Sequence, residues 1–129
     1  MIRLSFCYFF VGTVLGAFML INKVISFNLE VWKILPIHIE MMIFGWIIQF
    51  TVGTGYWMLP RLVKGKPRGN ETIAFLIPLV LNLGIIIIIS SYLIFQSYEL
   101  RLVGRALEAL IVPIFITLHW KRVSKQIHT

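Results

Sequence analysis

Residue types that could hold a metal or a cofactor gather on one face of a long apolar segment. With His38 at zero and 100° per residue, the other members fall between about −20° and about 60°: Met42, Gly45, Gln49 and Gly53. Small residues below an imidazole let a flat group or another backbone approach closely. Neutral imidazole is a common axial ligand of heme iron, and an apolar wall keeps water from the ring. A heme b group therefore fits this pattern, with His38 as metal ligand and the other four residues as cofactor contacts, and so does another backbone.

Charged residues of another apolar segment are expected at the same depth. Arg101, Arg105 and Glu108 share a face at the outer end of that segment, and charges this far into a span usually face protein, pair with each other or serve a function. Two interpretations stay open. The arginines clamp heme propionates through bidentate hydrogen bonds, or Arg105 pairs with Glu108 while Arg101 extends to the membrane interface. Glu40 falls about 200° from His38 and is a poor ligand candidate for the same iron.

The elements that must position these residues are membrane-spanning helices. The chain has 129 residues, of which 59% are hydrophobic, too apolar a composition for a water-soluble domain. Four apolar runs reach the length of about 20 residues that a spanning helix needs, near residues 4–24, 37–60, 72–95 and 102–120. We predict an all-α integral membrane protein, a four-transmembrane-helix bundle that forms one domain over residues 1–129.

The basic residues predict the orientation of this bundle. Lys and Arg number 12 against five acidic residues, and they lie at the ends of the apolar runs, as in membrane proteins, so we expect no nucleic-acid partner. Eight of them fall on one side of the membrane: Arg3, Arg61, Lys64, Lys66, Arg68, Lys121, Arg122 and Lys125. The other four are Lys23, Lys33, Arg101 and Arg105. The positive-inside rule predicts both termini in the cytoplasm, His38 near the outer surface, and a multi-pass protein of the inner (cytoplasmic) membrane.

Other features predict packing. Gly12 and Gly16 form a small-xxx-small pair that lets another helix approach closely. Asn82, together with Pro78, interrupts the third run and is expected to face protein, because an unpaired amide in hydrocarbon is costly. Cys7 lies alone in an apolar stretch, which excludes a disulfide framework and predicts an inert core thiol.

The second run resembles a known helix. In subunit I of the heme-copper oxidases (the cytochrome c, quinol and nitric oxide reductase superfamily), the second transmembrane helix carries a histidine ligand of the low-spin heme near the outer surface. A methionine, a glycine, a polar aromatic site and a proline follow it. At matching or near-matching offsets this sequence has His38, Met42, Gly53, Tyr56 and Pro60. "YWMLPR" looks like the end of that helix and "LPIH" like its beginning. The other spans look like helices I, III and IV, so the chain resembles the four N-terminal helices of a truncated subunit I.

Departures from that family limit the expected activity. The chain has three histidines, too few for the copper ligands and the second heme's ligand, so we expect no copper and no oxidase activity from this chain alone. His119 lies at the opposite end of the bundle from His38 and cannot bind the same iron. It is expected to lie at the membrane interface, and His128 on a solvated tail. The second axial position would come from a second copy of the chain, a partner subunit or a small ligand, or it would be vacant.

Three functions remain in competition. The first is a small heme b-binding subunit that passes electrons within a larger respiratory complex, or a homodimer, with a periplasmic cytochrome, a copper protein or quinol as exchange partner. The second is a heme-free structural or assembly subunit derived from the oxidase fold, and the third a heme-based gas sensor. An independent enzyme is disfavoured, because the sequence has no nucleophile–base pair, carboxylate dyad or phosphate-cradling loop. Membrane lipids and other membrane subunits are the expected partners.

Overall fold

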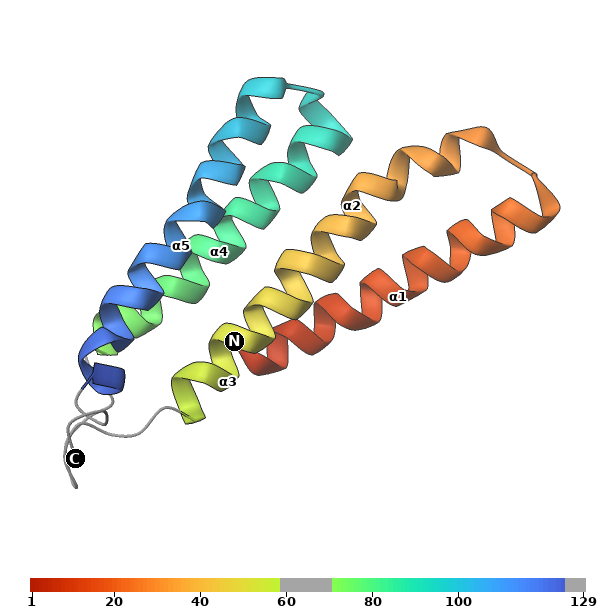
Figure 1. The fold of residues 1–129 in the computed structure, drawn as a ribbon. Helices are drawn as coiled ribbons and strands as arrows, with labels where there is room; N and C mark the ends of the chain where they lie inside the picture. Colours follow the sequence, from red (N-terminus) through yellow and green to blue (C-terminus); the bar gives the residue numbers. More distant parts are fainter. Residues whose placement is uncertain (59–70, 125–129) are drawn as a thin grey trace.

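A computed structural model describes residues 1–58 and 71–124, and all of its regular elements are helical (Figure 1). Four helices within the described residues are long and apolar enough to cross a membrane: Ile2–Ile25, Leu29–Met58, Glu71–Phe95 and Tyr98–Trp120. The predicted all-α fold with four spans is therefore confirmed. Some residues used in the predictions lie outside the described residues: Pro60, Arg61, Lys64, Lys66, Arg68, Lys125 and His128.

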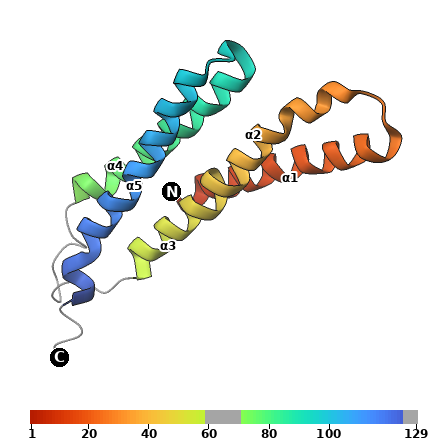
Figure 2. The same cartoon turned by 45° about the horizontal axis from the view of Figure 1, so that its top comes forward.

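The spans form two helical hairpins that lie side by side in both views (Figures 1 and 2). The first hairpin pairs α1 (Ile2–Ile25) with a composite second span. The second pairs α4 (Glu71–Ser90), which continues into η3 (Ser91–Phe95), with α5 (Tyr98–Ser124). The turns at residues 26–28 and 96–97 lie at one end of the molecule. The N terminus of α1 lies toward the other end.

The second span is built from four consecutive pieces, so its helical repeat changes along its length. A 3₁₀ segment, η1 (Leu29–Ile34), leads into α2 (Leu35–Glu40), then into a π-helical segment, η2 (Met41–Ile48), and finally into α3 (Gln49–Met58). The span thus begins eight residues before the predicted start at residue 37. Glu30 and Lys33 lower the hydropathy of that first piece, so the apolar run in the sequence starts only after it.

Two asparagines close the first turn. Asn22 Nδ2 donates to Asn28 O at 2.8 Å, and Asn28 N donates to Asn22 Oδ1 at 3.0 Å. Asn28 Oδ1 also accepts the Glu30 amide at 2.9 Å, which caps η1. Ser26 ends α1 in a left-handed conformation, with φ of 53°. The turn therefore leaves few buried backbone groups unsatisfied where the chain reverses.

An aliphatic core lies between the two hairpins. Ile77, Leu81 and Ile85 of α4 and Ile111 of α5 are almost completely buried. Tyr8 of α1 crosses to the second hairpin, where its hydroxyl donates to Asn82 Oδ1 at 2.9 Å.

Two expectations about packing meet different outcomes. Asn82 faces protein as predicted, because it accepts the Tyr8 hydroxyl of α1, and its amide nitrogen donates to Pro78 O of its own helix at 2.7 Å. Cys7, in contrast, is exposed. The prediction of a core thiol was wrong because an apolar residue of a membrane helix can face outward as readily as inward.

Candidate functional site

The His38 imidazole is held against α1. Its Nδ1 atom lies 2.8 Å from Gly12 O, and because a carbonyl oxygen only accepts, Nδ1 must carry the proton. A neutral imidazole protonated there presents a bare lone pair at Nε2, the form that ligates a metal. The absence of a side chain at Gly16 makes room for the ring, since a Cβ there would lie 2.8 Å from His38 Cε1. The predicted role of the Gly12/Gly16 pair in close helix packing is thus confirmed.

A cleft opens beside the imidazole, between α1 and the part of the second span nearer their turn. It has a volume of about 470 Å³ and is lined by residues of α1, η1, α2 and η2 that include Gly16, Trp32, His38 and Met42. Such a volume falls in the range of cofactor and ligand pockets, about 300–1,000 Å³. Among the described residues, no protein group is hydrogen-bonded to His38 Nε2.

The glycine strip below His38 is covered by α1. The Tyr8 ring lies over Gly45, and the side chains of Met1 and Ile2 lie over Gly53. Gln49 is fully buried, and its Nε2 donates to Met1 O at 3.3 Å. The small residues of the strip could accommodate either a flat group or another helix. Along the lower part of the strip, helix α1 of the same chain occupies that space.

The strip ends by turning from α1 toward α5. Tyr56 meets the ring of His119, with centroids 5.8 Å apart and planes at 86°. A π-helical segment has more residues per turn than an α-helix, so angles calculated at 100° per residue are less exact below η2, although Gln49 and Gly53 still contact α1. His119 is buried, at 4% exposure, against the rings of Tyr56 and Phe115. Its expected depth at the membrane interface stays a prediction. Its Nδ1 donates to Phe115 O at 2.8 Å.

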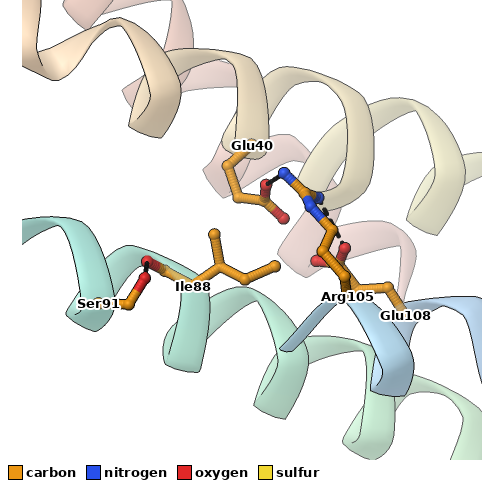
Figure 3. A network of polar contacts seen from close by, with 5 residues as sticks. All are labelled: Glu40, Ile88, Ser91, Arg105 and Glu108. Atoms are coloured by element: carbon orange, nitrogen blue, oxygen red, sulfur yellow. Dashed lines mark hydrogen bonds and ion pairs between the residues drawn. The ribbon is translucent and has the colours of Figure 1, made fainter. Parts of the chain in front are cut away.

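A buried ionic network joins the two hairpins on the opposite side of the second span. Arg105 NH2 lies 2.7 Å from Glu40 Oε2, and Arg105 NH1 lies 2.8 Å from Glu108 Oε2 (Figure 3). Glu40 and Glu108 are buried, with exposures of 0% and 4%. The ring of Phe44 covers the guanidinium, 4.8 Å from its centroid. Arg105 therefore pairs with two carboxylates. Of the two interpretations from the sequence, the structure has the Arg105–Glu108 pair, and Glu40 is a further partner.

Arg101 lies one helical turn nearer the end of the molecule and is held differently. Its guanidinium lies over Tyr92 and Tyr98, at 4.9 and 5.7 Å from their ring centroids. Within the described part of the chain it has no carboxylate partner. The cavity that Arg101 lines shares no residue with the cleft beside His38. Met42 thus lines the same cleft as His38, whereas Arg101 and Arg105 do not line it.

Sequence reasoning missed two contacts that organise the site. The Glu40–Arg105 pair joins two different hairpins, and the angular position of Glu40 on its own helix does not identify which helix faces it. Gly84 and Gly104 meet across the second hairpin, where a Cβ on Gly84 would lie 3.1 Å from Gly104 O. The signal was present, since each is the single glycine of its predicted run.

Four spanning helices, a buried ionic network and an anchored imidazole define a multi-pass helical membrane protein with a candidate cofactor site. Residues 1–121 match the family model described as Cytochrome C and Quinol oxidase polypeptide I. The chain belongs to this family. Comparison with curated proteins and with solved structures gave no significant match.

Proposed function

We propose that the chain is a small heme b-binding membrane subunit that passes electrons within a larger redox complex, with His38 as an axial ligand. One observation carries the proposal: the hydrogen bond from His38 Nδ1 to Gly12 O, which leaves the Nε2 lone pair beside an apolar cleft. Family membership supports it, because oxidase subunit I proteins generally bind heme.

The residues around His38 fit a heme group on the side of the cleft. Gly16 leaves room for the imidazole, and the backbone carbonyl of Gly12 fixes the orientation of the ring. Apolar residues of α1 and η1 would exclude water from the cleft. Met42 packs against Gly12 directly below and would close the cleft from that side. A bound heme would supply one-electron chemistry. The chain's own contribution is to ligate, orient and desolvate it.

The test is the optical spectrum of the purified protein and of His38→Ala. The wild-type protein is expected to show a b-type heme spectrum and a pyridine hemochrome, and the variant is expected to lose both. His119→Ala is the matched control, because His119 packs against Phe115 and Tyr56 at the other end of the molecule. Heme bound equally by wild type and His38→Ala would refute the assignment.

A second candidate function, a heme-free structural or assembly subunit, is favoured by a different observation. The lower glycine strip is filled by Tyr8, Met1 and Ile2 of the chain itself, so its small residues are explained by helix packing alone. This candidate predicts a colourless, folded protein. It also predicts that His38→Ala leaves assembly with partner subunits intact, while a bulky residue at Gly53 disrupts it.

A further inference from the structure

A polar cavity lies at the turn end of the molecule, between the two hairpins. It has a volume of about 420 Å³ and is lined by Lys33 and Pro36 of the second span and by Ser91, Tyr92, Gln96 and Arg101 of the second hairpin. Two of these residues are cations that come from different hairpins, and none is a carboxylate. The cavity therefore has a positive charge that its own walls do not neutralise.

Arg101 is the fixed member of the pair. A guanidinium is always charged, and in the described residues this one has neither an ion pair nor a hydrogen bond. Its Nε atom is buried without a partner. The rings of Tyr92 and Tyr98 hold it in place through cation–π contacts. Arg105, one turn further into the span, shows the contrast, because two carboxylates satisfy it.

Lys33 is the adjustable member. It pairs with Glu30 on its own helix, but both side chains are exposed, at 74% and 66%. Exposed pairs of this kind contribute little, about 0–1 kcal/mol, so the ammonium can exchange Glu30 for another anion. Lysine is also a point charge on a flexible stem, which suits a ligand whose position varies.

The position of the cavity selects the class of anion. Both cations lie about one helical turn inside the ends of candidate spanning helices, where we expect phosphate headgroups to be within reach. Exposed hydrophobic residues directly precede Gln96: Leu93, Ile94 and Phe95. An anion that carries acyl chains could place them along this apolar stretch, which a soluble anion would leave uncovered. Basic pockets between membrane helices are known to bind anionic headgroups.

We propose that this cavity binds a phosphate group supplied by the headgroup of an anionic phospholipid, with Arg101 as the bidentate ligand and Lys33 as the second cation. The lipid would lie between the ends of the two hairpins and hold them together. The proposal does not depend on heme, because the cavity and the cleft beside His38 have no residue in common.

The experiment measures lipid retention by native mass spectrometry of the full chain, released from nanodiscs that contain phosphatidylglycerol and phosphatidylcholine. Wild type is expected to retain one phosphatidylglycerol in preference to phosphatidylcholine. Arg101→Gln and Lys33→Gln should each weaken retention about fivefold, which corresponds to about 1 kcal/mol per basic residue at the surface. Lys23→Gln is the control, since Lys23 lies in the last turn of α1, near the same end of the molecule, but does not line the cavity.

Three outcomes decide the proposal. Phosphatidylglycerol retained equally by wild type and Arg101→Gln would overturn it, and so would equal losses in Lys33→Gln and Lys23→Gln. In a second arm, inorganic phosphate is added at millimolar concentration to protein in phosphatidylcholine nanodiscs. Binding in that arm, abolished by Arg101→Gln, would assign the site to a soluble anion and overturn the lipid assignment. Thermal unfolding of each variant checks the fold, and Lys33→Gln keeps the test decisive because an exposed side chain has little effect on stability.

Discussion

At the scale of single residues, the two glycines that face the second span make different contacts. A Cβ at Gly16 would meet the His38 ring at 2.8 Å, whereas a Cβ at Gly12 would meet the thioether of Met42, with Sδ at 2.7 Å. The imidazole is rigid and tethered to Gly12 O, while methionine is flexible and adapts its rotamer. Position 16 is therefore the one that controls where the imidazole lies.

We predict that Gly16→Ala displaces His38 and lowers heme retention about tenfold or more, as loss of an orienting contact does at other metal ligands. Gly12→Ala keeps the carbonyl that accepts from Nδ1 and should retain heme close to the wild-type level. The measurement is heme bound per chain, by pyridine hemochrome, after purification. Equal heme content in the two variants would show that the contact at Gly16 does not position the ligand.

The Arg105 network predicts a change in stability. Removal of one partner from a buried ion pair costs about 3–5 kcal/mol. The Arg105 side chain is 44% exposed, so we expect Arg105→Met to lower the free energy of unfolding by about 2–3 kcal/mol, in detergent and by denaturant titration. The triple variant Arg105→Met/Glu40→Gln/Glu108→Gln should recover part of this loss, because no uncompensated carboxylate remains. A triple variant less stable than Arg105→Met would contradict the charge argument.

At the scale of elements, close contact between α4 and α5 depends on two glycines. A Cβ at Gly104 would lie 3.0 Å from Gly84 O and would overlap the side chain of Ile88. Backbone cannot move aside as a flexible side chain does, so the helices would have to separate. Gly55 offers a comparison, because a Cβ there would meet a single ring atom of Phe115, at 3.2 Å.

We therefore predict that Gly104→Ala lowers the free energy of unfolding by about 1–2 kcal/mol. Overpacking costs about 1–3 kcal/mol, and the better helix propensity of alanine offsets part of it. Gly55→Ala should be neutral or stabilising, for the same propensity reason. Both are measured by reversible unfolding in detergent, and a Gly104→Ala protein as stable as wild type would refute the packing argument.

The elements also show which parts of the structure were predictable. Apolar length gave the four spans, and the angular position of Glu40, opposite His38, agrees with its contact to Arg105 on α5. The π-helical segment was not predictable, because its residues, Met41–Ile48, are as apolar as an α-helical span. The sequence therefore did not indicate that Tyr56 contacts His119 of α5. Nor could it show that α1 would cover the glycine strip, since the pattern fitted a flat group equally well.

At the scale of the whole molecule, polar contacts join hairpins whose facing surfaces are otherwise apolar. Tyr8 reaches Asn82 across the interface, and Glu40 reaches Arg105. In hydrocarbon, apolar surfaces have no hydrophobic preference for each other, so hydrogen bonds and close packing determine which helices associate. These contacts fix one arrangement of the hairpins, with both turns at the same end.

The orientation of this arrangement in the membrane is a prediction from charge, and cysteine labelling tests it. Leu29 and Glu99 are exposed and lie next to the two turns. In a Cys7→Ser background, Leu29→Cys and Glu99→Cys should react with a membrane-impermeant maleimide added to intact spheroplasts, because the eight basic residues predicted on the opposite side hold that side in the cytoplasm. Thr129→Cys should react only after the membrane is permeabilised. If only Thr129→Cys were labelled in intact spheroplasts, the orientation of the protein in the membrane would be the reverse of the predicted one. It would then place His38 and the phosphate-binding cavity on the cytoplasmic side, so that a periplasmic electron donor could no longer be the exchange partner.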